Sequence, residues 1–160
     1  MMSLLTWIST TAYSTWLQED PGIWGFPLAL AVHTLGMGIL VGASWAVALR
    51  LLGFASGIPT VHLRPLFGVM WFGFWINAVS GVVMFIAHPV ERGTSAVFWF
   101  KIAMVVLGML AVSRLRHLLD ATGEGSQVPP QAKPLAWASL SLWVAAVTAG
   151  RLIAYIGGNG

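Results

Sequence analysis

The chain contains four long stretches of mostly apolar residues, at positions 23–52, 66–88, 96–119 and 135–156. Each has about 20 residues or more, which as an α-helix is enough to cross the roughly 30 Å hydrocarbon core of a bilayer. The pattern therefore predicts an all-α fold, an integral membrane four-helix bundle. The length of the chain leaves room for one membrane domain, residues 1–160, and no second folded domain.

The segment before the first stretch, residues 1–19, predicts a short N-terminal interfacial helix. Its apolar residues recur at helical spacing, with serine and threonine between them. They include Leu5, Ile8, Ala12 and Trp16. Asp20 and Pro21 then interrupt the pattern, in the order expected of an N-cap and a first helical position.

Prolines and glycines predict where the spans begin and end. Pro27 marks either the start of the first span or a kink within it, and Pro89 ends the second span because it cannot continue a helix. Gly157 and Gly158 follow the fourth span. A polar, proline-rich linker is expected at residues 123–133.

The composition agrees with a lipid-facing protein and excludes several kinds of site. Apolar types make up 58% of the chain and charged types 8%, against about 25% charged residues in a soluble domain. Cysteine is absent, which excludes disulfides, thiolate metal sites and covalent haem attachment. The formal charge of +3 does not indicate nucleic-acid binding, because the few basic residues sit at helix ends.

Basic residues predict the orientation of the bundle. One end collects most of them: Arg50, Arg64, Arg114, Arg116 and Lys133. The loops of the opposite end contribute only Arg92, which follows Glu91. Because basic loops stay in the cytoplasm, both termini are expected on the periplasmic side of a bacterial inner membrane.

Polar side chains within the spans are the main candidates for function. They are His33, Asn77, His88, Lys101 and Arg151. An ionisable group in hydrocarbon costs several kcal/mol unless it is paired or bound, so each of these residues is a candidate by default.

The four histidines fall into two pairs by depth. His33 and His88 lie toward the outer end, and His62 and His117 lie toward the inner end. A b-type haem needs two imidazoles at matching depth on separate helices, so the outer pair predicts one haem and the inner pair a second. For His62 and His117 the alternative is a surface role. A span that starts at Pro27 would place His33 about 9 Å below that start, deeper than His88.

Cations and small residues near these histidines fit a haem but have simpler interpretations as well. Lys101 and Arg151 would neutralise the outer propionates, although Arg151 would also suit snorkelling to the interface. Asn77 is expected on the same helix face as His88. Arg64 and Arg114 would serve the inner site, or simply set topology. Glycines beside the histidines, such as Gly36 and Gly81, either leave space for a porphyrin or let helices pack closely.

Three segments resemble a family of small bacterial four-helix membrane proteins of unknown function. They are Leu-Arg-Leu-Leu-Gly at 49–53, Phe-Lys at 100–101 and Gly-Arg-Leu-Ile-Ala-Tyr at 150–155. The resemblance extends to His-Thr-Leu-Gly at 33–36 and covers most of the chain. Position 48 is Ala where that family usually has Asp, so no role of an acid carries over. The resemblance implies the fold and leaves the function open. More distantly, the architecture is similar to four-helix di-haem b-type cytochromes and to the membrane domains of copper-resistance proteins.

The sequence thus favours a membrane-embedded haem b protein for electron transfer, with one or two haems and a quinone or periplasmic redox partner. Copper binding or transport is an alternative, because seven Met and four His accompany the lack of Cys. A non-catalytic subunit or scaffold that forms a homo-oligomer is another. No hydrolase motif is present, and whether the protein is a quinol-linked oxidoreductase stays open.

Overall fold

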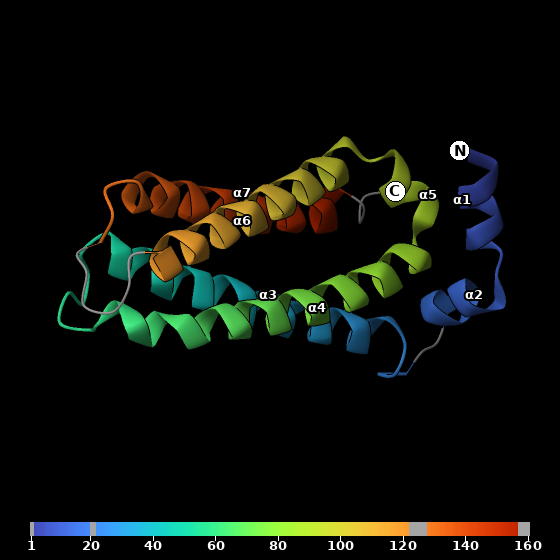
Figure 1. The fold of residues 1–160 in the computed structure, drawn as a ribbon. Helices are drawn as coiled ribbons and strands as arrows, with labels where there is room; N and C mark the ends of the chain where they lie inside the picture. Colours follow the sequence, from blue (N-terminus) through green and yellow to red (C-terminus); the bar gives the residue numbers. More distant parts are fainter. Residues whose placement is uncertain (1, 20–21, 122–127, 157–160) are drawn as a thin grey trace.

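The computed structural model describes residues 2–19, 22–121 and 128–156. It contains four long helices: α3 (Phe26–Leu51), α4 (Arg64–Ala87), α6 (Ala96–Ala121) and α7 (Ala132–Ile156). Each is long and apolar enough to cross a bilayer. The chain is a multi-pass membrane protein with an all-α four-helix bundle (Figure 1), as the sequence predicted. The predicted ends of the spans lie within three residues of the observed ones.

The four helices form two closely packed pairs. α3 runs along α4, and α6 runs along α7, while α7 also packs on α3 (Figure 1). Glycines allow the first pair to approach closely. A Cβ atom on Gly36 would lie 2.8 Å from the backbone nitrogen of Asn77, and one on Gly73 would lie 2.7 Å from that of Leu40. The backbones of α3 and α4 therefore touch at this crossing, as in other membrane helix pairs that meet at small residues.

The apolar core fills the interior of the bundle. Its largest fully buried side chains include Leu40, Phe67, Met70, Leu115 and Trp143. On the outside, large apolar side chains such as Leu35, Phe72, Val79 and Leu110 remain more than half exposed. Exposed apolar side chains on all four helices are what a lipid environment requires, and the bundle thus contacts the bilayer.

The N-terminal segment forms two short helices where the sequence predicted one. α1 (Met2–Ser9) and α2 (Ala12–Glu19) are separated at Thr10 and Thr11, whose hydroxyls donate hydrogen bonds to backbone carbonyls of the preceding turn. These bonds compete with continued helix. The pair packs on the end of the bundle, since Ser14 and Gln18 donate to the backbone carbonyls of Ile86 and Ala87.

Several local predictions are corrected by the structure. Arg92 lies in a further short helix, α5 (Pro89–Thr94), and not in a loop, because Pro89 suits a first helical turn as well as it ends α4. Of the two alternatives for Pro27, the structure has the start of the span, since Pro27 lies in the first turn of α3. Lys133 belongs to α7 and not to the linker.

Some predicted features cannot be compared with the structure. The proposed cap at Asp20 and Pro21, and the end at Gly157 and Gly158, lie outside the described residues. The same holds for positions 123–127 of the predicted linker.

Candidate functional site

A polar cluster lies inside the bundle, surrounded by apolar helix surfaces. It consists of His33 on α3, Asn77 and Ser80 on α4, and Lys101 on α6. Only 8% of the His33 surface is exposed, and its two ring nitrogens both have partners. Nδ1 lies 3.1 Å from Ser80 Oγ, and Nε2 lies 3.3 Å from Lys101 Nζ. His33 therefore joins the two helix pairs through its ring.

The hydrogen-bond network assigns the tautomer of His33. The Lys101 ammonium can only donate, so Nε2 is the acceptor and Nδ1 carries the proton. Nδ1 then donates to Ser80 Oγ, whose own hydroxyl donates to the backbone carbonyl of Ile76 at 2.6 Å. Both ring nitrogens of His33 thus have a matching donor or acceptor, which a neutral imidazole in a low-dielectric interior requires.

Asn77 and Gly81 hold His33 in place. The Asn77 side chain donates to the backbone carbonyl of His33 at 2.9 Å, linking α4 to α3. Gly81 faces the imidazole, and a Cβ atom there would lie 3.2 Å from His33 Cε1. Both glycines therefore serve close packing in this structure. Gly81 packs against the ring of His33, and Gly36 packs against helix α4.

A second group of polar residues lies at the adjacent end of the bundle. Arg92 donates to the backbone carbonyl of Met84, and its guanidinium carbon lies 5.7 Å from the centre of the Phe26 ring, within the range of a cation–π contact. The same ring meets His88 edge-on at 5.5 Å. The guanidinium thus contacts both α3 and α4 near the polar cluster.

The charges at this end shift the pKa values of Arg92 and His88. Burial lowers the pKa of His88 below its usual value, and the positive charge of Arg92 lowers it further, with Glu91 opposing part of that shift. Nδ1 of His88 lies 3.9 Å from the Glu91 carboxylate. Burial also lowers the pKa of Arg92, which still leaves it a cation at neutral pH.

Positive charge in this region is not balanced by buried acids. Lys101 and Arg92 lie within electrostatic reach of each other. Glu91 offsets part of the charge of Arg92, whereas among the described residues Lys101 forms no ion pair with a carboxylate. The Lys101 side chain passes over Gly150 of α7, where a Cβ atom would be 3.6 Å from Nζ. Two cations and a neutral imidazole thus lie within electrostatic reach of one another at this end of the bundle.

The structure brings some predicted site residues together and separates others. His33, Asn77 and Lys101 meet, whereas His88 has a different set of neighbours, Phe26 and Glu91. His88 follows Ser80 by eight residues, which is about 12 Å along a helix axis. The mismatch in depth expected for His33 and His88 is therefore present.

The predicted inner site does not form a cluster. His62 lies in the 3₁₀ turn Thr60–Leu63 and His117 in α6, both exposed, and neither ring bonds to another described residue. Arg64 pairs with Asp120 at 3.5 Å, which matches a topological and structural role. Arg114 and Arg151 are exposed on α6 and α7. No group of three or more His, Cys, Asp or Glu side chains suited to a metal occurs in the described parts of the chain.

These contacts do not fit a haem held between His33 and His88 in the present conformation. An iron ligand must offer a free ring nitrogen, but Ser80 and Lys101 occupy both nitrogens of His33. Binding of iron at Nε2 would first require Lys101 to move away. No step is therefore derived through a haem, which stays a prediction from the sequence.

Sequence reasoning missed two contributors to the site. Ser80 is three residues after Asn77 and so on the same helix face, a signal that could have found it. Arg92 was assigned only to topology, because nothing in its local sequence indicates that it folds back between α3 and α4.

Comparison with protein-family models, with curated proteins and with solved structures finds no match to this chain. The family suggested by the motifs at 49–53 and 150–155 therefore stays a prediction.

Proposed function

We propose that this protein binds an anionic group, a carboxylate or a phosphate, within the membrane between Lys101 and Arg92. One observation carries the proposal: Lys101 lies inside the bundle, and its partner is an imidazole where a buried cation usually has an acid. An uncompensated cation in hydrocarbon is costly. A bound anion would remove most of that cost.

Each residue of the cluster has a role in this proposal. Lys101 donates to the anion, and His33 positions Lys101 by accepting one of its protons at 3.3 Å. Ser80 fixes the tautomer that makes His33 an acceptor, and Asn77 fixes the backbone of His33. Arg92 supplies a second positive charge within electrostatic reach of Lys101.

The cluster lies toward the Arg92 end of the bundle and the interior beyond it is filled, which favours binding over conduction. Toward the other end, the touching backbones at Gly36 and Gly73 and the apolar core around Leu40 and Met70 fill the interior. With the basic end of the bundle in the cytoplasm, the cluster would take its ligand from the periplasmic side of a bacterial inner membrane. We also keep self-association into a homo-oligomer as a proposal.

Anion-dependent stability tests this function. Thermal unfolding of the purified protein in detergent is measured in chloride, acetate and phosphate at one pH and one ionic strength. A ligand that binds only the folded state adds about 1.4 kcal/mol for each tenfold rise in its concentration above the dissociation constant. We expect this dependence for acetate or phosphate in the wild type, and its loss in Lys101→Met and reduction in Arg92→Gln.

Lys133→Met is the matched control, because Lys133 is an exposed lysine of α7 outside the site. It should keep the wild-type dependence. Stability that follows ionic strength alone, or a dependence that survives in both Lys101→Met and Arg92→Gln, would contradict the proposal.

A haem is also a carboxylate-bearing molecule, so the electron-transfer hypothesis is tested on the same protein. Its absorption spectrum should contain a Soret band, and reduction should produce a sharp α-band, if haem b is bound. Elemental analysis for iron and copper separates haem from the copper alternative. A quinone or periplasmic redox partner follows only from a positive spectrum.

A further inference from the structure

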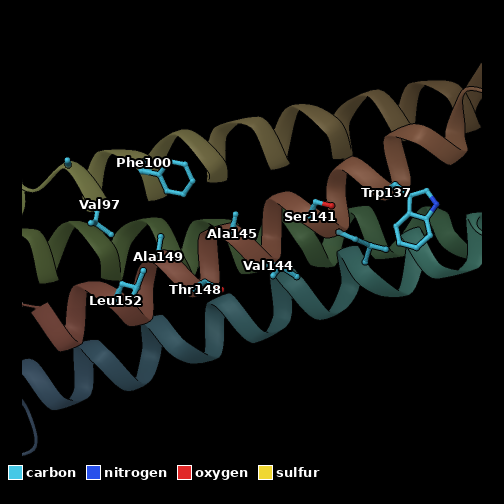
Figure 2. Close-up of a pocket in the computed structure, with 11 residues that line it drawn as sticks. Val97, Phe100, Trp137, Ser141, Val144, Ala145, Thr148, Ala149 and Leu152 are labelled. Carbon is cyan, nitrogen blue, oxygen red and sulfur yellow. The ribbon is translucent and has the colours of Figure 1, made fainter.

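An apolar groove of about 760 Å³ lies between α6 and α7, and no residue of the polar cluster lines it. Figure 2 shows Val97 and Phe100 of α6 on one side and a row of α7 residues from Trp137 to Leu152 on the other. Apart from the hydroxyls of Ser141 and Thr148, the side chains that line it are apolar.

The length of the groove matches a lipid tail. Fifteen residues separate Trp137 from Leu152, which is about 22 Å along α7. The hydrocarbon of one leaflet is about 15 Å deep, half of a roughly 30 Å core. An acyl chain with its headgroup level with one end of the groove would lie entirely within it.

The two ends of the groove differ in chemistry. Trp137, Val144 and Arg151 are seven residues apart, so they share one face of α7. Trp137 and Val144 line the groove, and the exposed Arg151 continues their row at its far end. That end also holds Lys101, which contacts Gly150, and it is therefore positively charged. A guanidinium binds phosphate through two parallel hydrogen bonds.

A second copy of the chain fits this groove less well than a lipid. Copies in a membrane share one orientation, so a two-fold axis along the membrane normal would bring each residue of the α7 face near its own counterpart. Arg151 would then face Arg151, and the like charges would repel each other. A lipid phosphate would instead neutralise Arg151.

We propose that the α6–α7 groove binds one acyl chain of an anionic phospholipid, with the phosphate held by Arg151. This inference does not depend on the anion site at Lys101. The net charge of the headgroup matters because a zwitterionic lipid brings its own cation close to Arg151, which repels it.

Native mass spectrometry of the full chain tests the proposal. The protein is released from detergent in the presence of phosphatidylglycerol or phosphatidylcholine with identical acyl chains. We expect the wild type to bind phosphatidylglycerol about tenfold more tightly. Arg151→Gln should bring that affinity down to the level of phosphatidylcholine, whereas Arg114→Gln, at an exposed arginine of α6 that does not line the groove, should not.

Two substitutions that fill the groove test the tail. Ala145→Leu and Thr148→Phe place larger side chains in the lining and should weaken both lipids by at least tenfold. Thr148 is exposed, so its substitution leaves the contact between α6 and α7 intact. Arg92→Gln, at a residue of the anion site that does not line the groove, should leave the preference for phosphatidylglycerol unchanged, which separates this site from the anion site of the bundle.

Several results would overturn the proposal. Equal affinity for the two lipids, or a preference that persists in Arg151→Gln, would show that Arg151 does not bind the headgroup. Unchanged lipid binding in both groove-filling variants would show that the acyl chain does not lie in the groove. A dimer that these variants dissociate and phosphatidylglycerol does not would show that a second copy occupies the groove.

Discussion

Lys101 on α6 reaches His33 on α3, with 3.3 Å between Nζ and Nε2. In a spanning helix a lysine usually extends its ammonium toward the interface, yet this one stays inside the bundle beside an imidazole. The contact joins the helix pair α3–α4 to the pair α6–α7 through one hydrogen bond. The tautomer of His33 and the stability of the bundle therefore both depend on this hydrogen-bond network.

The tautomer of His33 should be the one with the proton on Nδ1. Lys101 donates to Nε2, and Ser80 accepts from Nδ1. Nitrogen NMR of the histidine-labelled protein should therefore show one protonated nitrogen at Nδ1 in the wild type. Lys101→Met removes the donor and should release the ring to a mixture of tautomers. Identical spectra of the two proteins, assigned with His33→Gln, would mean that the contact does not form.

Ser80→Ala should destabilise the bundle modestly. The substitution leaves the Nδ1 proton of a buried imidazole without an acceptor, which costs about 1–3 kcal/mol. Unfolding by a denaturing detergent gives the free energy. Thr94→Ala is a suitable control, because the exposed Thr94 hydroxyl bonds only to backbone carbonyls of its own helix. Equal stability of Ser80→Ala and the wild type would argue against a hydrogen-bonded His33.

The crossing of α3 and α4 should not tolerate a methyl group. Gly36→Ala would place its Cβ atom 2.8 Å from the backbone nitrogen of Asn77, so the helices must separate. Overpacking of this kind costs about 1–3 kcal/mol. Gly38→Ala, two residues away on α3, meets nothing within 4 Å and should be neutral or slightly stabilising. If the two variants unfold at the same temperature, the close approach is absent.

Stability should fall as the pH drops below about 6.5 because of His88. Burial and Arg92 keep the pKa of folded His88 below the value of 6.5 expected in the unfolded chain. The unfolded state therefore binds the proton first, and stability present above pH 6.5 is lost as the pH falls toward the folded pKa. Unfolding of wild type, His88→Gln and Arg92→Gln between pH 7.5 and 5 measures this.

His88→Gln should flatten the pH dependence, and Arg92→Gln should reduce it by removing one of the two causes. Glu91→Gln should steepen it, since the carboxylate favours the charged imidazole. A profile that is the same in all four proteins would assign the pH dependence to other groups.

The spans could be predicted from the sequence because their signal is local. About 20 consecutive apolar residues identify a spanning helix without knowledge of its neighbours, and all four were placed within three residues. The break at Thr10 and Thr11 and the short helix at Pro89 were missed. Both depend on hydrogen bonds of a few residues that compete with alternatives of similar energy.

The candidate site was predictable only in part, because it depends on how helices rotate against each other. The cost of polar groups in hydrocarbon correctly selected His33, Asn77 and Lys101 as residues that need partners. Depth alone then paired His33 with His88. The observed partner of Nε2 is Lys101, since rotation of α6 about its axis decides that contact, and no pattern along one helix encodes it.

The glycine crossing has a mechanical consequence for the site. Because the backbones touch at Gly36 and Gly73, α3 and α4 form one closely packed pair. α6 packs chiefly on α7 and scarcely on α4, so it belongs to the other helix pair. His33 lies on the pair α3–α4, and Lys101 lies on the pair α6–α7. A ligand that separates these two side chains would therefore break a hydrogen bond between the two helix pairs, which are also joined where α7 packs on α3.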